Sequence, residues 1–265
     1  MITDYKNKTA LITGASSGIG REFALQLAQA GANLVLASRN TVKLNEVADV
    51  IEKSGMPGKV IEIIEANLEL KEMPQNLFQI MKEKKIKVDL LVNNAGFGLR
   101  CRFEEEPFDR NLAMNMLNVV SLSSMCRLFI PPMLERGLGG VINVASTASF
   151  QPVPYMSNYA ATKAFVFRLS LGLFEEYRKR GVHVMALCPG FTRTGFQKIA
   201  GIKGEFLKKQ PMLDPDQVVK EALQAFLRRE PYFVPRAQRS FILLTLAKIL
   251  PTRLIVKIAG DMFKP

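Results

Sequence analysis

Tyr159 and Lys163 are four residues apart in the stretch SNYAATKAF (157–165), so both side chains face the same way if the stretch is helical. Ser146 ends an apolar run thirteen residues before Tyr159. Hydride transfer to a carbonyl needs a donor that polarises the oxygen, a proton source and a group that tunes this source. A lysine ammonium favours ionisation of a phenol, whose ordinary pKa is about 10. These residues predict general acid/base catalysis, and the alternative is a solvated helix surface.

A glycine-rich turn near the start of the chain is a candidate site for the hydride donor. Gly14, Gly18 and Gly20 lie between the apolar run 9–13 and an amphipathic helical pattern. Glycine permits a tight turn and lets the backbone approach a pyrophosphate, which then meets the positive end of the helix. The turn predicts a dinucleotide site, and the alternative is a plain strand-to-helix turn.

The second apolar run, 33–38, bears on the choice of cofactor, because its end is expected to meet the adenosine ribose. An acid at this place binds the free 2′-hydroxyl of NAD, whereas this chain has Ser38 and Arg39. A guanidinium suits the 2′-phosphate of NADP through charge-assisted hydrogen bonds. We therefore expect NADP rather than NAD, and the alternative is that Arg39 is an ordinary surface arginine.

Short apolar runs alternate with helical patterns along most of the chain, at 9–13, 33–38, 59–64, 88–92, 140–146 and 182–187. Several runs are apolar at successive positions, which is typical of parallel strands covered on both sides. The pattern predicts an α/β fold in which one doubly wound parallel sheet carries helices on both faces, as a single domain over 1–265. Residues 191–212 are expected to form a substrate loop, and residues 236–265 an apolar helical extension.

Composition argues against several classes of function. The net charge is +12, but the basic residues are spread along the chain without a dense basic arm, so no nucleic-acid partner is expected. Three cysteines without a CxxC pair, and a single histidine, His183, suggest neither a disulfide framework nor a metal site. The first residues lack a long apolar run after a basic start, so we expect a cytoplasmic protein.

Taken together, the motifs resemble those of the short-chain dehydrogenase/reductase family over residues 5 to 235. The matching features are the glycine turn 13–20, NNAG at 93–96, Asn115, Ser146, the Tyr159–Lys163 pair, and Pro189–Gly190 followed by Thr194. The resemblance implies a Rossmann-type fold and an NADP-dependent oxidoreductase.

The resemblance also implies roles for the catalytic residues. Tyr159 would exchange a proton with the substrate oxygen, which Ser146 would also bind. Lys163 would bind the nicotinamide ribose and lower the pKa of Tyr159. Asn115 would hold a water molecule that leads the proton relay to solvent.

Further residues are implied in cofactor binding by the same resemblance. Thr194 would contact the carboxamide. Asn67 stands where many members of the family have an aspartate beside the adenine. The full set of expected contacts is Gly14, Ser16, Ser17, Gly18, Ile19, Gly20, Ser38, Arg39, Asn67, Leu68, Asn94, Ala95, Gly96, Tyr159, Lys163, Pro189, Gly190, Thr192 and Thr194.

An apolar pocket is expected beside the nicotinamide, formed by Phe97, Ala148, Phe150, Tyr155, Phe191 and Phe196, with no fixed charge among them. This predicts an apolar carbonyl or alcohol substrate that is lipid-like, steroid-like or an aromatic ketone. The alternatives are a 3-oxoacyl-thioester reductase and a non-catalytic NADP-binding regulator.

The apolar extension has three readings from the sequence. Its uninterrupted apolar stretches are shorter than the ~20 residues that span a bilayer, so it is expected to cover the pocket, form a subunit contact or lie at a membrane surface. The family resemblance favours a homodimer or homotetramer.

Overall fold

The computed structural model describes residues 2–202, 210–236 and 251–264, and this part of the chain forms a seven-stranded sheet in which every neighbouring pair is parallel. The strand order is β3-β2-β1-β4-β5-β6-β7. The strands are β1 (Thr9–Thr13), β2 (Asn33–Ser38), β3 (Lys59–Glu65), β4 (Leu90–Asn93), β5 (Gly139–Val144), β6 (Val182–Leu187) and β7 (Tyr232–Phe233). The doubly wound parallel sheet expected from the sequence is confirmed.

Burial follows position in the sheet. Strands β5 and β6 are buried at every residue, as expected for a parallel sheet with both faces covered. The outer strand β3 instead carries exposed charged residues at its two ends, Lys59 and Glu65. The apolar run 59–64 thus belongs to a strand at the edge of the sheet, whereas the runs of β5 and β6 belong to strands with neighbours on both sides.

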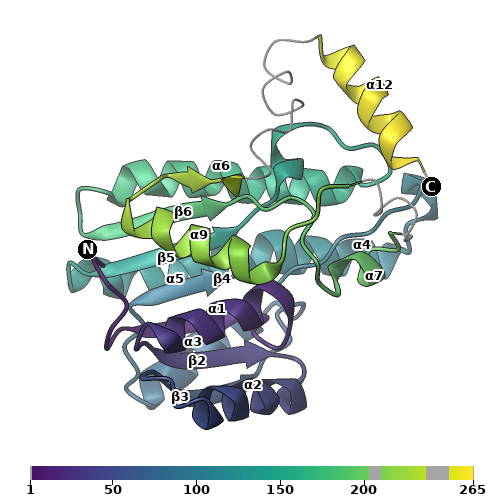
Figure 1. Ribbon diagram of the computed structural model, residues 1–265. Coiled ribbons are helices and arrows are strands. Elements are labelled where there is room, and N and C mark those ends of the chain that lie inside the picture. The colour runs from purple at the N-terminus through teal and green to yellow at the C-terminus, as the bar shows by residue number, and fades with distance from the viewer. Residues whose placement is uncertain (1, 203–209, 237–250, 265) are drawn as a thin grey trace.

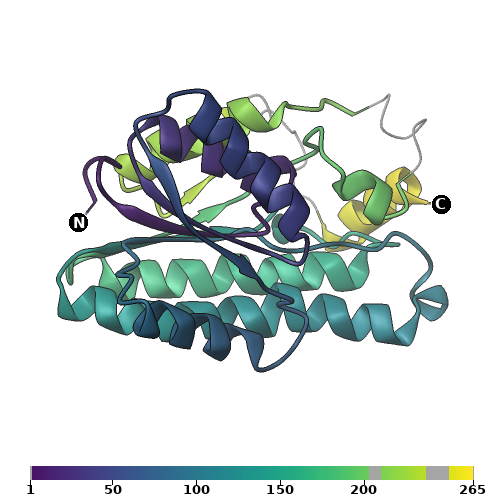
Figure 2. The ribbon, with the colours of Figure 1, turned by 90° about the horizontal axis from the view of Figure 1, so that it is seen from below.

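Helices cover the two faces of the sheet and enclose two hydrophobic cores (Figures 1 and 2). One core includes Phe23, Leu44 and Phe226, and the other includes Met81, Phe129 and Val166. The first face is covered by α1 (Gly18–Gln29), α2 (Thr41–Lys53) and α9 (Pro215–Leu227), and the second by α3 (Met73–Glu83), α5 (Leu122–Glu135) and α6 (Ser157–Tyr177).

The second face contains a long run of helix with an irregular middle. Helix α4 (Phe108–Asn115) continues through a π-helical turn, η2 (Met116–Ser121), into α5. Residues 108–135 contain an 18-residue window with a mean hydropathy of 1.3, so by length and composition this helix could cross a membrane, but half of that window is buried in the protein. Phe129 and Met133 pack into the core beside the sheet, which is the usual reason for such composition in a core helix.

The segments that follow β4, β5 and β6 gather at the carboxyl edge of the sheet (Figure 1). They include the 3₁₀ turns η1 (Phe103–Glu105) and η3 (Thr147–Phe150) and the short helix α7 (Phe196–Ile199). Helix α12 (Thr252–Phe263) lies at the same edge and supports the expected helical extension. Residues 203–209 of the expected substrate loop and 237–250 of the extension lie outside the described residues.

Candidate active site

A cavity of about 430 Å³ lies at the carboxyl edge, where β1 separates the two halves of the sheet. This is the place at which doubly wound sheets bind ligands, because the chain leaves β1 and β4 in opposite directions. The residues after β1, β2 and β3 line one end of the cavity, and those after β5 and β6 line the other.

The glycine turn forms the wall of the first end. Gly14 and Gly18 have φ angles of 66° and 54°, which favour glycine, and both line the cavity with Ser16, Ser17 and Ile19. Ser17 precedes α1 in an extended conformation and makes no side-chain cap, so the first N–H groups of the helix remain available to an anion.

Gly20 has a different role from the one expected. It is absent from the cavity wall, and an added Cβ would overlap the carbonyl oxygen of Gly14 and the amide of Asn94. Gly20 therefore lets α1 pack closely against the turn rather than contacting a cofactor itself.

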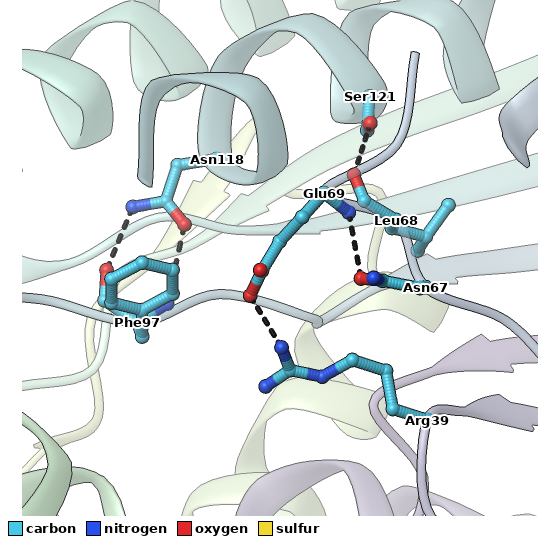
Figure 3. A network of polar contacts seen from close by, with 7 residues as sticks. All are labelled: Arg39, Asn67, Leu68, Glu69, Phe97, Asn118 and Ser121. Carbon is cyan, nitrogen blue, oxygen red and sulfur yellow. Dashed lines mark hydrogen bonds and ion pairs between the residues drawn. The ribbon is translucent and has the colours of Figure 1, made fainter. Parts of the chain in front are cut away.

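Polar residues meet at the end of the cavity formed by the glycine turn and the segments after β2 and β3 (Figure 3). Arg39 Nη1 lies 2.6 Å from Glu69 Oε1, and the backbone N–H of Glu69 donates to Asn67 Oδ1 at 3.2 Å. Arg39, Asn67 and Glu69 all line the cavity, together with the expected Ser38 and Leu68. Glu69 was missed by the sequence analysis, because nothing in the stretch EANLEL indicates that its second-last residue reaches back to β2.

The NNAG segment joins the site to the sheet. Asn93 is buried at the end of β4 and donates to Asn143 Oδ1 at 2.9 Å, which ties two neighbouring strands together. Asn94 Nδ2 donates to the carbonyl oxygen of Thr13 at 2.9 Å, and Asn94, Ala95 and Gly96 line the cavity.

Tyr159, Lys163 and Ser146 come together on the cavity wall, although they belong to two different segments. Tyr159 and Lys163 lie on α6 and are 8% and 4% exposed. Lys163 Nζ donates to the carbonyl oxygen of Val144 at 2.8 Å, and Ser146 is hydrogen-bonded to Tyr159. The i,i+4 pair is therefore buried against the end of β5 rather than exposed on a helix surface.

Burial dominates the electrostatics of this pair. It raises the pKa of Tyr159 to about 12, against a smaller lowering by the hydrogen bond with Ser146, and it lowers the pKa of Lys163 to about 8. Lys163 is not among the groups that shift the pKa of Tyr159, so the expected lowering by its ammonium group is not found. Tyr159 therefore keeps its proton near neutral pH, as a proton donor in carbonyl reduction requires.

The structure does not place Asn115, the asparagine expected from the sequence, beside this pair. Asn115 does not line the cavity, and its side chain donates to Asn111 on the same helix at 3.2 Å. Asn118 is fully buried and donates to the carbonyl oxygen of Phe97 at 2.9 Å and to Thr162 Oγ1 at 3.1 Å. The π-helical turn Met116–Ser121 changes the helical register at this point, so α-helical spacing does not reveal which asparagine turns inward.

Aromatic residues form part of the apolar end of the cavity, and two of those expected do not. Phe97, Ala148, Phe191 and Phe196 line it. Phe150 instead packs on Phe167, with ring centres 4.8 Å apart. Tyr155 has a φ of 65° and is absent from the lining, which its neighbour Met156 joins. The loop conformation determines where these two side chains point, and a loop has no regular repeat from which the sequence could predict it.

Several residues of this end were not foreseen. Met262 and Phe263 reach the cavity from α12, and Ile199 and Ile202 reach it from the segment around α7. Arg110 also lines it, with its guanidinium 4.3 Å from the ring centre of Phe97. The cavity wall therefore includes a cation where none was expected. The cavity is also lined by four residues that were expected to contact the cofactor: Pro189, Gly190, Thr192 and Thr194.

Comparison with known proteins identifies the family. The short chain dehydrogenase family model matches residues 8–202 of this chain. The chain belongs to the short-chain dehydrogenase family. The human very-long-chain 3-oxoacyl-CoA reductase is 31% identical over 96% of this chain and 79% of its own length.

Solved structures, among them one of a short-chain dehydrogenase, agree with this assignment. One from Sphingobium yanoikuyae in complex with NADPH is 32% identical, with a TM-score of 0.79 over 91% of this chain and 94% of that one. The bulky-bulky ketone specific alcohol dehydrogenase from Comamonas testosteroni is 29% identical, with a TM-score of 0.77 over 91% of each chain. This short-chain dehydrogenase is an oxidoreductase with a Rossmann fold.

Proposed function

We propose that this enzyme uses NADP(H) to interconvert a carbonyl and a secondary alcohol on an apolar substrate. The observation that carries the proposal is the position of Tyr159. It lies with Ser146 and Lys163 in a cavity that has a glycine turn and helix N-terminus at one end and phenylalanine side chains at the other. The glycine turn and Arg39 fit the phosphates of NADP, which when bound supplies or accepts the hydride.

The proposed chemistry assigns one task to each polar side chain. Tyr159 donates its phenolic proton to the substrate oxygen during reduction and takes it back during oxidation. Ser146 binds the same oxygen and so favours the charge that develops on it. Lys163, held by the carbonyl oxygen of Val144, presents its ammonium group to the nicotinamide ribose and offsets negative charge on Tyr159.

We assign the fourth role, support of the proton relay, to Asn118 in place of Asn115. A Cβ added to Gly96 would lie 2.9 Å from Asn118 Oδ1 and 3.3 Å from Lys163 Nζ. Because Gly96 has no side chain, the space between Asn118 Oδ1 and Lys163 Nζ stays open. Water held there would connect Lys163 to the backbone around Asn118.

The preference for NADP rests on Arg39, which lines the adenosine end with its side chain 56% exposed. Glu69 counts against this preference, because a carboxylate at the same place repels a 2′-phosphate. Family members at 26% identity or more have been solved with NADPH and with NAD. The ratio of the two dissociation constants measures the preference directly.

The apolar end of the cavity supports a lipid-like, steroid-like or aromatic ketone as substrate. The alternative is a 3-oxoacyl thioester, which is favoured by the name of the human relative and by Arg110, a cation that suits an anionic group. A non-catalytic NADP-binding regulator is disfavoured because Ser146, Tyr159 and Lys163 are all present and adjacent.

The experiment that tests this function compares rates of NADPH and NADH oxidation on apolar ketones, aldehydes, small sugars and 3-oxoacyl-CoA thioesters. The proposal expects NADPH-dependent turnover of apolar ketones. Preference for the thioesters, with an acyl carrier protein as competitor, supports the alternative. Tight NADPH binding without turnover of any carbonyl supports a regulator, and preference for a sugar contradicts the apolar site.

We also propose peripheral contact with a membrane through α12. Its outer face exposes Leu254 and Ile258 beside Arg253 and Lys257, a combination that suits the interface of an anionic bilayer. Sedimentation with phosphatidylglycerol vesicles, and not with phosphatidylcholine vesicles, would support this contact. No sedimentation with either would contradict it.

A homodimer or homotetramer and a cytoplasmic location complete the proposal. Phe108 and Leu112 on α4 and Phe165 on α6 are exposed apolar side chains that a second copy could cover. All three cysteines are free thiols, which suits a reducing compartment. Analytical ultracentrifugation gives the oligomeric state, and a monomer would contradict the first part.

A further inference from the structure

The end of helix α12 is part of the cavity wall, although it is far in sequence from the other lining residues. Met262 and Phe263 line the cavity, and the Phe263 ring is stacked on Phe191 at 6.3 Å between centres with 23° between planes. Phe191 follows the Pro189–Gly190 pair at the nicotinamide end. The last turn of α12 therefore covers the part of the cavity where the substrate is expected.

The same helix is seated on the protein by one face. Ile255 and Ala259 are 4% and 1% exposed, whereas Arg253, Leu254 and Lys257 on the outer side are exposed. A Cβ added to Gly260 would lie 3.6 Å from Pro154 Cγ, so the helix also lies against the loop before α6. The apolar contact fixes which face turns inward, but it leaves the end of the helix to be held by other groups.

Arg100 holds that end. Its Nε donates to the carbonyl oxygen of Phe263 at 3.0 Å, and its Nη2 donates to that of Lys264 at 2.6 Å. The last carbonyl groups of a helix have no partner within the helix and carry its negative dipole end, so a guanidinium with two parallel donors suits them.

Arg100 is itself fixed to the catalytic framework. Its backbone N–H donates to the carbonyl oxygen of Ala200 at 2.9 Å, next to α7. Three residues earlier, both backbone polar groups of Phe97 are hydrogen-bonded to the side chain of Asn118. The chain from Phe97 to Arg100 therefore connects the buried site to α7 and to the end of α12.

We propose that Arg100 is a positioning residue that holds the end of α12 over the cavity, so that Met262 and Phe263 determine the size of substrate the enzyme binds. The inference rests on the proposed carbonyl reductase function and assigns a selectivity role within it. A long apolar substrate reaches Phe263, and burying its chain against this ring strengthens its binding. A short substrate stays beside Tyr159 and does not contact Phe263.

The test uses methyl ketones of increasing chain length, from 2-butanone to 2-tetradecanone, with NADPH and three variants. Arg100→Ala removes both hydrogen-bond donors, and Arg100→Lys keeps the positive charge but not the paired donors of the guanidinium. Phe263→Ala removes the aromatic ring and keeps the backbone carbonyl oxygen. Arg102→Ala is the matched control, because Arg102 is an exposed arginine in the same loop.

Arg100→Ala and Phe263→Ala are each expected to raise KM for the longest ketone by about tenfold, as if about two methylene groups lost their burial. KM for 2-butanone is expected to change less than KM for 2-tetradecanone, and Arg102→Ala is expected to keep kcat, every KM and the Kd of NADPH within about twofold of the native values. Arg100→Lys should fall between Arg100→Ala and the native protein. Equal KM values for Arg100→Ala and Arg102→Ala at every chain length would overturn the proposal.

Two other outcomes are possible: Arg100→Ala fails to bind NADPH, or the native protein reduces no carbonyl. If Arg100→Ala no longer binds NADPH, its KM values do not report on substrate size, and the same KM comparison is then made with Phe263→Ala and Arg100→Lys. If the native protein reduces no carbonyl, the proposed function fails. Calorimetric binding of 2-tetradecanone to the native, Arg100→Ala and Arg102→Ala proteins then tests the positioning role alone, and equal affinities would overturn it.

Discussion

Arg39 Nη1 lies 2.6 Å from Glu69 Oε1, so the guanidinium expected to bind the cofactor's 2′-phosphate is paired with a carboxylate. The Glu69 side chain is only 16% exposed, whereas that of Arg39 is 56% exposed. Arg39 can turn toward a phosphate with its remaining donors, but Glu69 stays near the same place. The preference for NADP over NAD therefore depends on two opposing effects: Arg39 attracts the 2′-phosphate and Glu69 repels it.

Arg39→Ala is expected to weaken NADPH binding by about tenfold and to change NADH binding little, because one partly exposed charge-assisted contact is lost. Glu69→Gln should tighten NADPH binding a few-fold, because it removes the repelling charge and keeps the side chain's size. Fluorescence titration gives both dissociation constants, with Lys53→Ala, at the far end of α2, as the charge control. Equal losses for NADPH and NADH in Arg39→Ala would contradict a role in selecting NADP.

Asn118→Ala should damage the enzyme far more than Asn115→Ala. The first change leaves the buried N–H and carbonyl groups of Phe97 without the Asn118 side chain, at roughly 1–3 kcal/mol for each unsatisfied group, whereas Thr162 keeps its bond to the carbonyl oxygen of Tyr159. The second removes one contact within a helix. Thermal unfolding and NADPH-dependent turnover of the two variants make the comparison, and greater loss in Asn115→Ala would restore the position expected from the sequence.

The sequence does not reveal whether Asn115 or Asn118 turns inward. The strands could be predicted because a covered parallel sheet requires unbroken apolar runs, and the shared face of Tyr159 and Lys163 could be predicted because α6 is a regular helix. In RNLAMNMLNVV, however, Asn111, Asn115 and Asn118 all have helical spacing, and the choice among them depends on a π-helical turn. No residue in the stretch indicates that turn.

The apolar end of the cavity was harder to predict for a related reason. Phe150 and Tyr155 lie in the irregular segment between β5 and α6, where side-chain direction follows the loop and not a period. Phe263 enters the site through contact with Arg100 and Phe191, each far away in sequence. Glu69 likewise meets Arg39 only because β2 and β3 are neighbours in the sheet.

Gly20 and Gly172 provide a test of the glycine turn with an internal control, because both lie within helices. Gly20→Ala should abolish NADPH binding or folding, since the added Cβ overlaps the carbonyl oxygen of Gly14. Nothing lies within 4 Å of a Cβ at Gly172, so Gly172→Ala should stabilise the protein by about 0.5–1 kcal/mol. Denaturant unfolding measures both, and native-like NADPH affinity in Gly20→Ala would contradict the packing role.

Buried Lys163 should make stability depend on pH in a defined direction. Its pKa is lowered from 10.5 to about 8, so between these values the unfolded chain binds a proton that the folded chain does not. Stability contributed by this residue therefore rises with pH across this window, by at most about 1.4 kcal/mol per pH unit. The free energy of unfolding of the native protein minus that of Lys163→Met should increase from pH 8 to pH 10.5. A flat or falling difference would contradict the burial of a lysine with a lowered pKa.

The central claim is that Tyr159 is the proton donor of an NADPH-dependent reductase. The most direct measurement is NADPH oxidation by the native protein and by Tyr159→Phe, on the ketone that the native protein reduces best, together with the Kd of NADPH for each. We expect kcat to fall by about 10²- to 10⁴-fold in Tyr159→Phe while the Kd of NADPH stays unchanged. Turnover by Tyr159→Phe within a few-fold of the native rate would contradict it.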